Sequence, residues 1–69
     1  MTRRIAAHRV VDGTKVIDMG AVEMNDGIVA RYYSIDGELP MTVWMGGTIY
    51  IKSDEKGLLR AYKNGKQII

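Results

Sequence analysis

Cysteine and phenylalanine are absent from this 69-residue chain, and it has one histidine, one proline and one tryptophan. Without cysteine there is no disulfide framework, and a single histidine cannot complete a zinc-finger ligand set. A catalytic triad needs a base oriented beside its nucleophile, and His8 is the only imidazole in the sequence. These absences predict a protein with no catalytic residue, no metal site and no cofactor.

Long apolar runs are also missing. After the basic start only Ile5, Ala6 and Ala7 precede His8 and Arg9, which is shorter than the roughly 7 to 15 apolar residues of a secretory signal. No run approaches the roughly 18 apolar residues of a membrane span. Together with the lack of cysteine, this favours a cytoplasmic protein that has no membrane partner.

What the chain does contain is ordinary globular composition, with 46% hydrophobic and 26% charged residues. Such a chain should fold, here as one domain over residues 1–69. Its net charge of +2 permits contact with nucleic acid without arguing for it. Because a domain of this size buries only about 60% of its unfolded surface, partner subunits are a plausible source of further stability.

Turn signals recur along the chain, because glycine and a preceding Asp or Asn tolerate the backbone of tight hairpins. Intervals of about 8 to 12 residues between such signals are typical of an all-β sandwich or barrel. We therefore expect a small antiparallel sandwich or a partly open barrel with about six to seven short strands. The signals are Asp12-Gly13, Asp26-Gly27, Asp36-Gly37, Gly46-Gly47, Lys56-Gly57 and Asn64-Gly65.

Apolar residues alternate with polar ones between these turns, which is the period of a β-strand. Residues 4–11 read as a strand, and residues 28–33, apolar on both faces, predict a central strand. In residues 41–51 the apolar Met41, Val43, Ile49 and Ile51 are all odd-numbered, so one strand would place them on one side. Gly46-Gly47 therefore reads as a bend or bulge within one long strand. The last residues predict a hairpin closed by Asn64-Gly65.

The order of these segments resembles one known domain. RVVDG (9–13), GAVEMNDGIV (20–29), MGGTI (45–49) and LRAYKNGKQII (59–69) are similar to the small β-domain, or composite domain, that accompanies the metal-dependent barrel of the amidohydrolase superfamily. Residues 5–51 resemble its amino-terminal part and residues 58–69 its carboxy-terminal part. A short turn at Lys52 to Gly57 stands where those enzymes insert the barrel.

The departure from that family concerns its catalytic part. There the barrel opens with Pro-Gly and a strand that carries two metal-binding histidines, whereas this chain has Ile49, Tyr50, Ile51 and Lys52 in that place. No family catalytic residue can be carried over, so the resemblance implies a β-domain without hydrolase activity. One form of this hypothesis is a domain that complements a separately encoded barrel.

Few residues suggest a site. Trp44 and Tyr50 would lie on the same side of the predicted strand. With the basic residues Arg31, Lys52 and Arg60 they form a candidate binding face for nucleic acid or a small ligand. The alternative is that these aromatic rings fill the core and its rim. We expect His8 to be structural or simply exposed.

The acidic residues suggest even less. Four aspartates beside turn glycines are best explained by turn chemistry, and Asp18 and Glu23 by solvated charges at a strand edge. Ser34 and Ser53 lie near turns, where hydroxyls usually bond to local backbone. No calcium-loop spacing and no phosphate-binding glycine loop is present.

Four methionines beyond Met1 suit irregular core gaps or an adaptable interface, and an open sheet has edges that need covering. The leading hypothesis is therefore a non-catalytic interaction or oligomeric structural module, which is a homo-oligomer or docks on a larger protein. A nucleic-acid or small-ligand module comes second. An enzyme, or a fragment that complements one, comes third.

Overall fold

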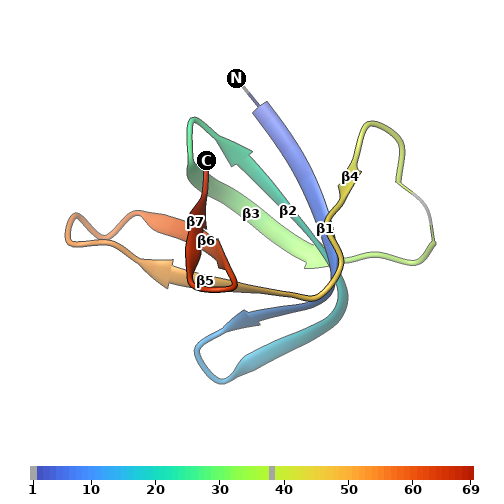
Figure 1. Cartoon of the computed structure of the whole chain (residues 1–69), viewed down its shortest axis with the longest axis horizontal. Helices are drawn as coiled ribbons and strands as arrows, with labels where there is room; N and C mark the ends of the chain where they lie inside the picture. The colour runs from blue at the N-terminus through green and yellow to red at the C-terminus, as the bar shows by residue number, and fades with distance from the viewer. Residues whose placement is uncertain (1, 38) are drawn as a thin grey trace.

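Seven strands make up the fold in the computed structural model, which describes residues 2–37 and 39–69 (Figure 1). This confirms the all-β class, and no helix in those two ranges is long and apolar enough to span a membrane. The strands are β1 (Thr2–Asp12), β2 (Lys15–Asn25), β3 (Ile28–Ser34), β4 (Val43–Trp44), β5 (Thr48–Ser53), β6 (Leu59–Lys63) and β7 (Lys66–Ile68).

All the strands belong to one sheet in the order β3-β2-β1-β5-β6-β7, with β4 also beside β1. The hairpin pairs are antiparallel, but β4 and β5 both run parallel to β1. The sheet is therefore mixed, whereas the turn spacing predicted only antiparallel pairs. The difference arises after β3. The chain then returns to β1, where Val43 pairs with Ile5, and it continues in the same direction as β1.

The β1–β2 hairpin bends in its middle. Ala7 pairs with Gly20 and Arg9 with Asp18, but the residues between them, His8 and Met19, do not pair, and Met19 has a φ of +55°. Before the bend Ile5 and Ala7 point into the core, and after it Val10 does so. The bend therefore moves the core-facing positions of β1 from odd-numbered residues to the even-numbered Val10.

Gly20 permits this bend sterically. A Cβ atom added at Gly20 would lie 2.6 Å from Cγ2 of Val10, which is too close unless Val10 moves. Glycine at residue 20 therefore leaves room for Val10 in the core.

Gly46-Gly47 forms a bulge as predicted, but it separates β4 from β5, so the single long strand expected over residues 41–51 is two short strands. From the pair Ile5–Val43 to the pair Arg9–Thr48, β1 advances by four residues while the facing chain advances by five. Both glycines have positive φ, near +70° and +64°, which only glycine adopts readily. The extra residue interrupts the shared parity, so the prediction that Met41 and Val43 lie with Ile49 and Ile51 is wrong. Met41 and Val43 are exposed, whereas both isoleucines are buried.

β3 is at the edge of the sheet, so the prediction of a central strand is wrong. Its apolar character on both faces comes from two tyrosines with separate partners. Tyr32 packs against the core and donates a hydrogen bond to Asp12, whereas Tyr33 donates one to Glu23 on β2. Aromatic rings that end in a hydroxyl can cover one side of an edge strand and still bond a carboxylate.

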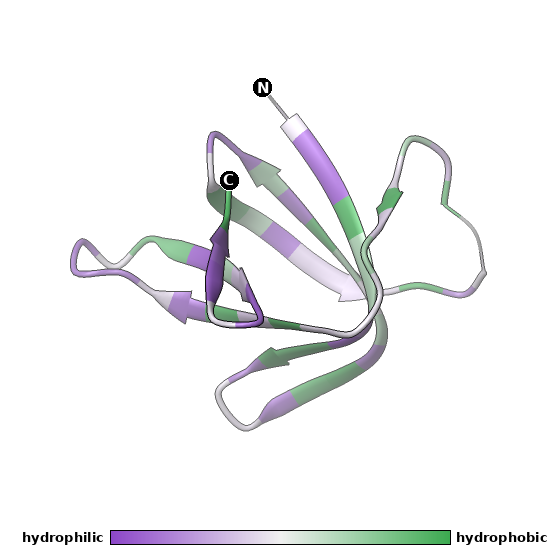
Figure 2. Ribbon diagram, viewed as in Figure 1, coloured by the Kyte–Doolittle hydropathy of each residue, from purple (hydrophilic) through white to green (hydrophobic). Residues whose placement is uncertain are grey.

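The sheet curls around a single core. Figure 2 shows hydrophobic and hydrophilic segments interleaved along the strands, and the buried apolar side chains come from every strand except β4. They are Ile5, Ala7, Val10, Val22, Met24, Val29, Ile49, Ile51, Ala61 and Ile68. A sheet whose strands share one core in this way is a partly open barrel.

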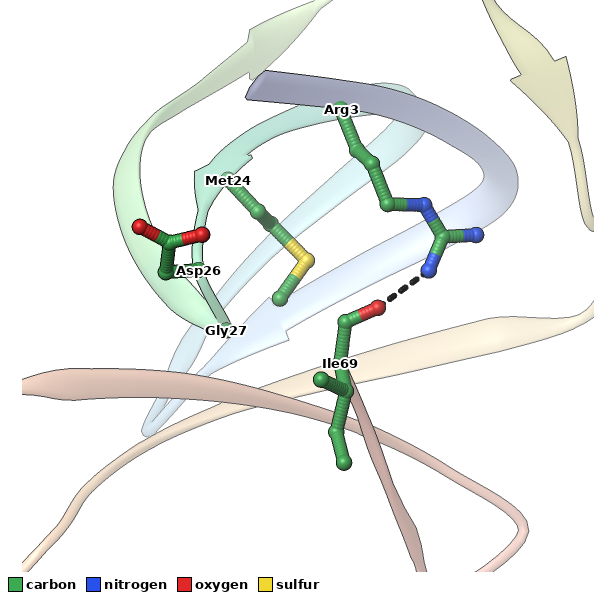
Figure 3. Close-up of a pocket in the computed structure, with 5 residues that line it drawn as sticks. All are labelled: Arg3, Met24, Asp26, Gly27 and Ile69. Carbon is green, nitrogen blue, oxygen red and sulfur yellow. Dashed lines mark hydrogen bonds between the residues drawn. The ribbon is translucent and has the colours of Figure 1, made fainter. Parts of the chain in front are cut away.

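The open seam of the barrel is bridged by two arginines. Arg60 donates a hydrogen bond of 3.1 Å to the carbonyl oxygen of Gly27 in the β2–β3 turn, and Arg3 donates one to the carbonyl oxygen of Ile69. Figure 3 shows the cavity of about 210 Å³ beside the second bond, lined by Arg3, Met24, Asp26, Gly27 and Ile69. We interpret this small cavity as a packing gap at the seam.

The Asn64-Gly65 turn joins β6 to β7 as predicted, with φ values of +54° and +77°. No heavy atom lies within 4 Å of a Cβ added at Gly65, so only the backbone conformation opposes a side chain there. We predict that Gly65→Val lowers the free energy of unfolding by about 1 to 2 kcal/mol, because the left-handed region is costly for such a residue. Gly65→Asn should lose less, since asparagine tolerates this region. Equal urea-denaturation midpoints for the two variants would contradict this explanation.

Candidate interaction surface

Trp44 is one of the large apolar side chains that are exposed. It lies on β4 beside Ala6 of β1, and half of its surface is exposed. The Trp44 and His8 rings meet edge to face, with centroids 4.8 Å apart and planes at 80°. His8 also accepts a hydrogen bond of 3.0 Å at Nδ1 from the backbone N–H of Gly47. His8 therefore braces both Trp44 and the glycine bulge, in agreement with its expected structural role.

A cavity of about 570 Å³ opens beside Trp44. It lies between β1, the middle of β2 and residues 35–37 and 39–44, and its lining is mostly apolar: Ala6, Met19, Ile35, Gly37, Leu39, Thr42 and Trp44. Backbone bonds hold its walls, because Ile35 donates to the carbonyl oxygen of Met19 and Met45 to that of Ala6, each at 2.8 Å. The Arg4 side chain donates to the carbonyl oxygen of Pro40 at 2.9 Å. These bonds hold Ile35, Pro40 and Met45 around the cavity.

Large apolar side chains on or next to β4, and Met19 of the cavity lining, face solvent. The exposed fractions are 93% for Met41, 55% for Val43 and 39% for Met19. Met24 and Met45, in contrast, are in or against the core, so the methionines divide between the two roles that the sequence suggested. We use the name β4 surface for Met19, Ile35, Leu39, Met41, Val43 and Trp44.

The candidate binding face predicted from the sequence does not form as one surface. Trp44 lies with β4, on the right in Figure 1, whereas β6 and β7 lie on the left. Tyr50 and Lys52 on β5 do come together, in a shallow groove of about 450 Å³ that Tyr62 and Gly65 also line. Tyr62, which pairs with Tyr50 across the β5–β6 hairpin, was not part of the predicted face. Counting residues back from Asn64-Gly65 and across that hairpin could have indicated the pair.

Each of the two arginines of that predicted face forms an ion pair with an acidic side chain. Arg31 donates to Glu23 through Nε at 2.9 Å and Nη2 at 3.2 Å. Arg60 donates to Asp54 at 3.0 Å as well as to Gly27. Both guanidinium groups are thus engaged in structural contacts.

Glu23 is not the solvated charge that the sequence predicted. Only 13% of its side chain is exposed, and Arg4 lies 3.4 Å away in addition to Arg31 and Tyr33. The hydrogen bonds from Arg31 and Tyr33 hold the pKa of Glu23 below its ordinary value. The hydrogen bond that Tyr33 donates to Glu23 is the main cause that raises the pKa of Tyr33. Asp18 does match the prediction, since 81% of its side chain is exposed and it faces Arg9 at 3.4 Å.

Asp54 shows the turn chemistry expected of it. Its Oδ1 accepts hydrogen bonds from the backbone N–H groups of Lys56 and Leu58, at 2.8 and 2.9 Å. The hydrogen bond from Arg60 is the main cause that lowers the pKa of Asp54. Within residues 2–37 and 39–69, no group of three or more His, Asp or Glu side chains gathers to hold a metal ion.

Comparison with known proteins gives one structural likeness to report. No protein-family model matches the chain, and no curated protein matches it. Among solved structures it is similar to a variant of N-acetyl-D-glucosamine-6-phosphate deacetylase from Mycobacterium smegmatis in complex with N-acetyl-D-glucosamine-6-phosphate, with a TM-score of 0.56 and 16% identity. The match covers 72% of this chain and spans only 13% of the deacetylase. It establishes a shared fold with a small part of that enzyme.

The depressed pKa values of Glu23 and Asp54 predict acid sensitivity. Their ordinary values are 4.5 and 3.8, so on acidification the unfolded chain takes up protons before the folded one does. The stability that both groups contribute should be fully present above about pH 5 and should decline as the pH falls below 4.5. Urea unfolding between pH 7 and pH 3 measures this. Glu23→Gln should weaken the pH dependence, and an unchanged profile would contradict the role of Glu23.

Partial exposure of Trp44 predicts a modest effect of truncation. We expect Trp44→Ala to lower the free energy of unfolding by about 1 kcal/mol, which is the magnitude of an edge-to-face aromatic contact. A fully buried tryptophan would instead lose about 3 to 5 kcal/mol. Thermal unfolding followed by circular dichroism distinguishes the two values. A loss in the larger range would mean that Trp44 belongs to the core.

Proposed function

We propose that this protein is a non-catalytic interaction module that associates through the β4 surface. One observation carries the proposal: Met41, Val43 and Trp44 are each at least half exposed on or beside a strand that pairs only with β1 among the described residues. Exposed apolar side chains on an edge strand are typical of surfaces that become covered by another chain. The occupant that we favour is a second copy of this chain.

The structural likeness supports a lineage for this module. A small β-domain of the amidohydrolase superfamily, separated from its barrel, accounts for the shared fold with a deacetylase and for the lack of clustered metal ligands in the described residues. In this proposal the chain keeps the fold of such enzymes without their catalytic function.

Docking onto a larger protein is a second candidate, and the same likeness favours it. The matching segment makes up only 13% of the deacetylase chain, so there the fold is a minor part of a longer polypeptide. A β-domain of this kind could complement a separate protein. The β4 surface would again supply the contact.

Self-association is testable with a matched pair of valines. Val43 on the β4 surface and Val16 on β2 are 55% and 54% exposed, so lysine at either position removes a similar area of exposed apolar surface. We predict that the wild-type chain and Val16→Lys form the same homo-oligomer in native mass spectrometry and light scattering, and that Val43→Lys is monomeric. A wild-type chain that is monomeric at every concentration would contradict self-association.

The docking form has its own readout with the same variants. Affinity capture should retain a larger protein with the wild-type chain and with Val16→Lys but not with Val43→Lys. Equal recovery by all three baits would contradict docking through the β4 surface.

A further inference from the structure

The methionines of the described residues fall into two classes. Met24 is 1% exposed and Met45 packs against the core. Met19 and Met41, in contrast, are 39% and 93% exposed. No other large apolar side chain in residues 2–37 and 39–69 is as exposed as Met41.

Backbone conformation distinguishes the same two exposed methionines. Met19 and Met41 have φ values of +55° and +58°, in the left-handed region. The other described non-glycine residues with positive φ are Asp26 and Asn64, each of which precedes a glycine in a turn. Turn chemistry accounts for Asp26 and Asn64, but a long apolar side chain rarely adopts this conformation. Backbone strain of this kind is typical of functional sites.

Both exposed methionines lie close to Trp44. Met19 lines the cavity of about 570 Å³ together with Trp44 and Thr42, and Met41 directly precedes Thr42. The Thr42 hydroxyl donates a hydrogen bond of 3.2 Å to the carbonyl oxygen of Pro40, so hydrogen-bonded residues stand on both sides of Met41. The fold therefore presents two thioether groups on the β4 surface.

A thioether that faces solvent can be oxidised by a peroxide. The sulfur lone pair attacks one oxygen of hydrogen peroxide, so that an S–O bond forms and the O–O bond breaks. The departing oxygen takes the proton of the transferred hydroxyl group and leaves as water. The sulfur is oxidised, the peroxide is reduced, and a flexible apolar side chain becomes a polar sulfoxide. Methionine sulfoxide reductases reverse this change.

We propose that Met41 and Met19 are sites of reversible oxidation to methionine sulfoxide, and that this modification ends association through the β4 surface. The effect on association rests on the proposed function. The sulfoxide oxygen accepts hydrogen bonds from water, and the cavity beside Trp44 has a mostly apolar lining that cannot replace them. Each covered sulfoxide should therefore weaken association about tenfold or more.

Peroxide treatment followed by peptide mapping with tandem mass spectrometry tests the sites. We expect Met41 to be oxidised first and Met19 next. Met45 and Met24 should follow far more slowly, because the core shields them. In urea all four should react at similar rates. Equal rates at Met41 and Met24 in the native protein would contradict the assignment.

Native mass spectrometry of the same samples tests the effect on association. The untreated chain should be oligomeric and the oxidised chain monomeric, and a methionine sulfoxide reductase should restore the oligomer. The double variant Met19→Leu, Met41→Leu keeps the apolar volume and should stay oligomeric in peroxide. Met45→Leu is the matched control and should dissociate like the wild type. Circular dichroism verifies that the oxidised chain stays folded.

The oligomeric state before treatment separates this inference from the proposed function. A monomeric untreated chain would contradict the proposed function together with the effect on association, and the rates at Met41 and Met24 would still decide the sites. An oligomer that persists with Met41 and Met19 fully oxidised would contradict the inference and leave the proposed function intact.

Discussion

β1 is the strand on which the rest of the structure depends. It pairs with β2 along its length on one side, and on the other side with β4 and then β5. A strand that pairs with neighbours on both sides of a curled sheet must turn a different set of side chains toward the core along its length. In β1 this change occurs between Ala7 and Val10. The absence of a side chain at Gly20 permits that change, because a Cβ there would meet Val10.

The exposed β4 surface is a consequence of the same arrangement. The partner of β1 must follow the bend, and it does so with one additional residue at Gly46-Gly47. His8, which has no pairing partner in the ladder, contacts Trp44 and accepts a hydrogen bond from Gly47. The local irregularity of β1 thus fixes both the position of Trp44 and its exposure. The resulting surface is the one to which we assign association.

Ion pairs and hydrogen bonds engage several of the basic side chains on the remaining surface. Arg31 and Arg4 lie against Glu23, and Arg60 lies against Asp54. These ion pairs stabilise the edge strand β3 and the seam of the barrel, so their arginines make structural contacts. Among the lysines of β5 to β7, Lys52 lies over the Tyr62 ring, whereas Lys63 donates a hydrogen bond of 2.8 Å to the carbonyl oxygen of Met45.

The sequence by itself determined the strands and their turns, because alternation and Asn-Gly or Asp-Gly pairs act over a few residues. The glycine bulge and the hairpin at Asn64-Gly65 were recognisable for this reason. The parallel pairs of β1, the edge position of β3 and the partial burial of Glu23 were decided only by tertiary structure. So was the separation of Trp44 from Tyr50 and the pairing of Tyr50 with Tyr62. Each depends on which strands become neighbours after a long connection, and local periodicity carries no information about that choice.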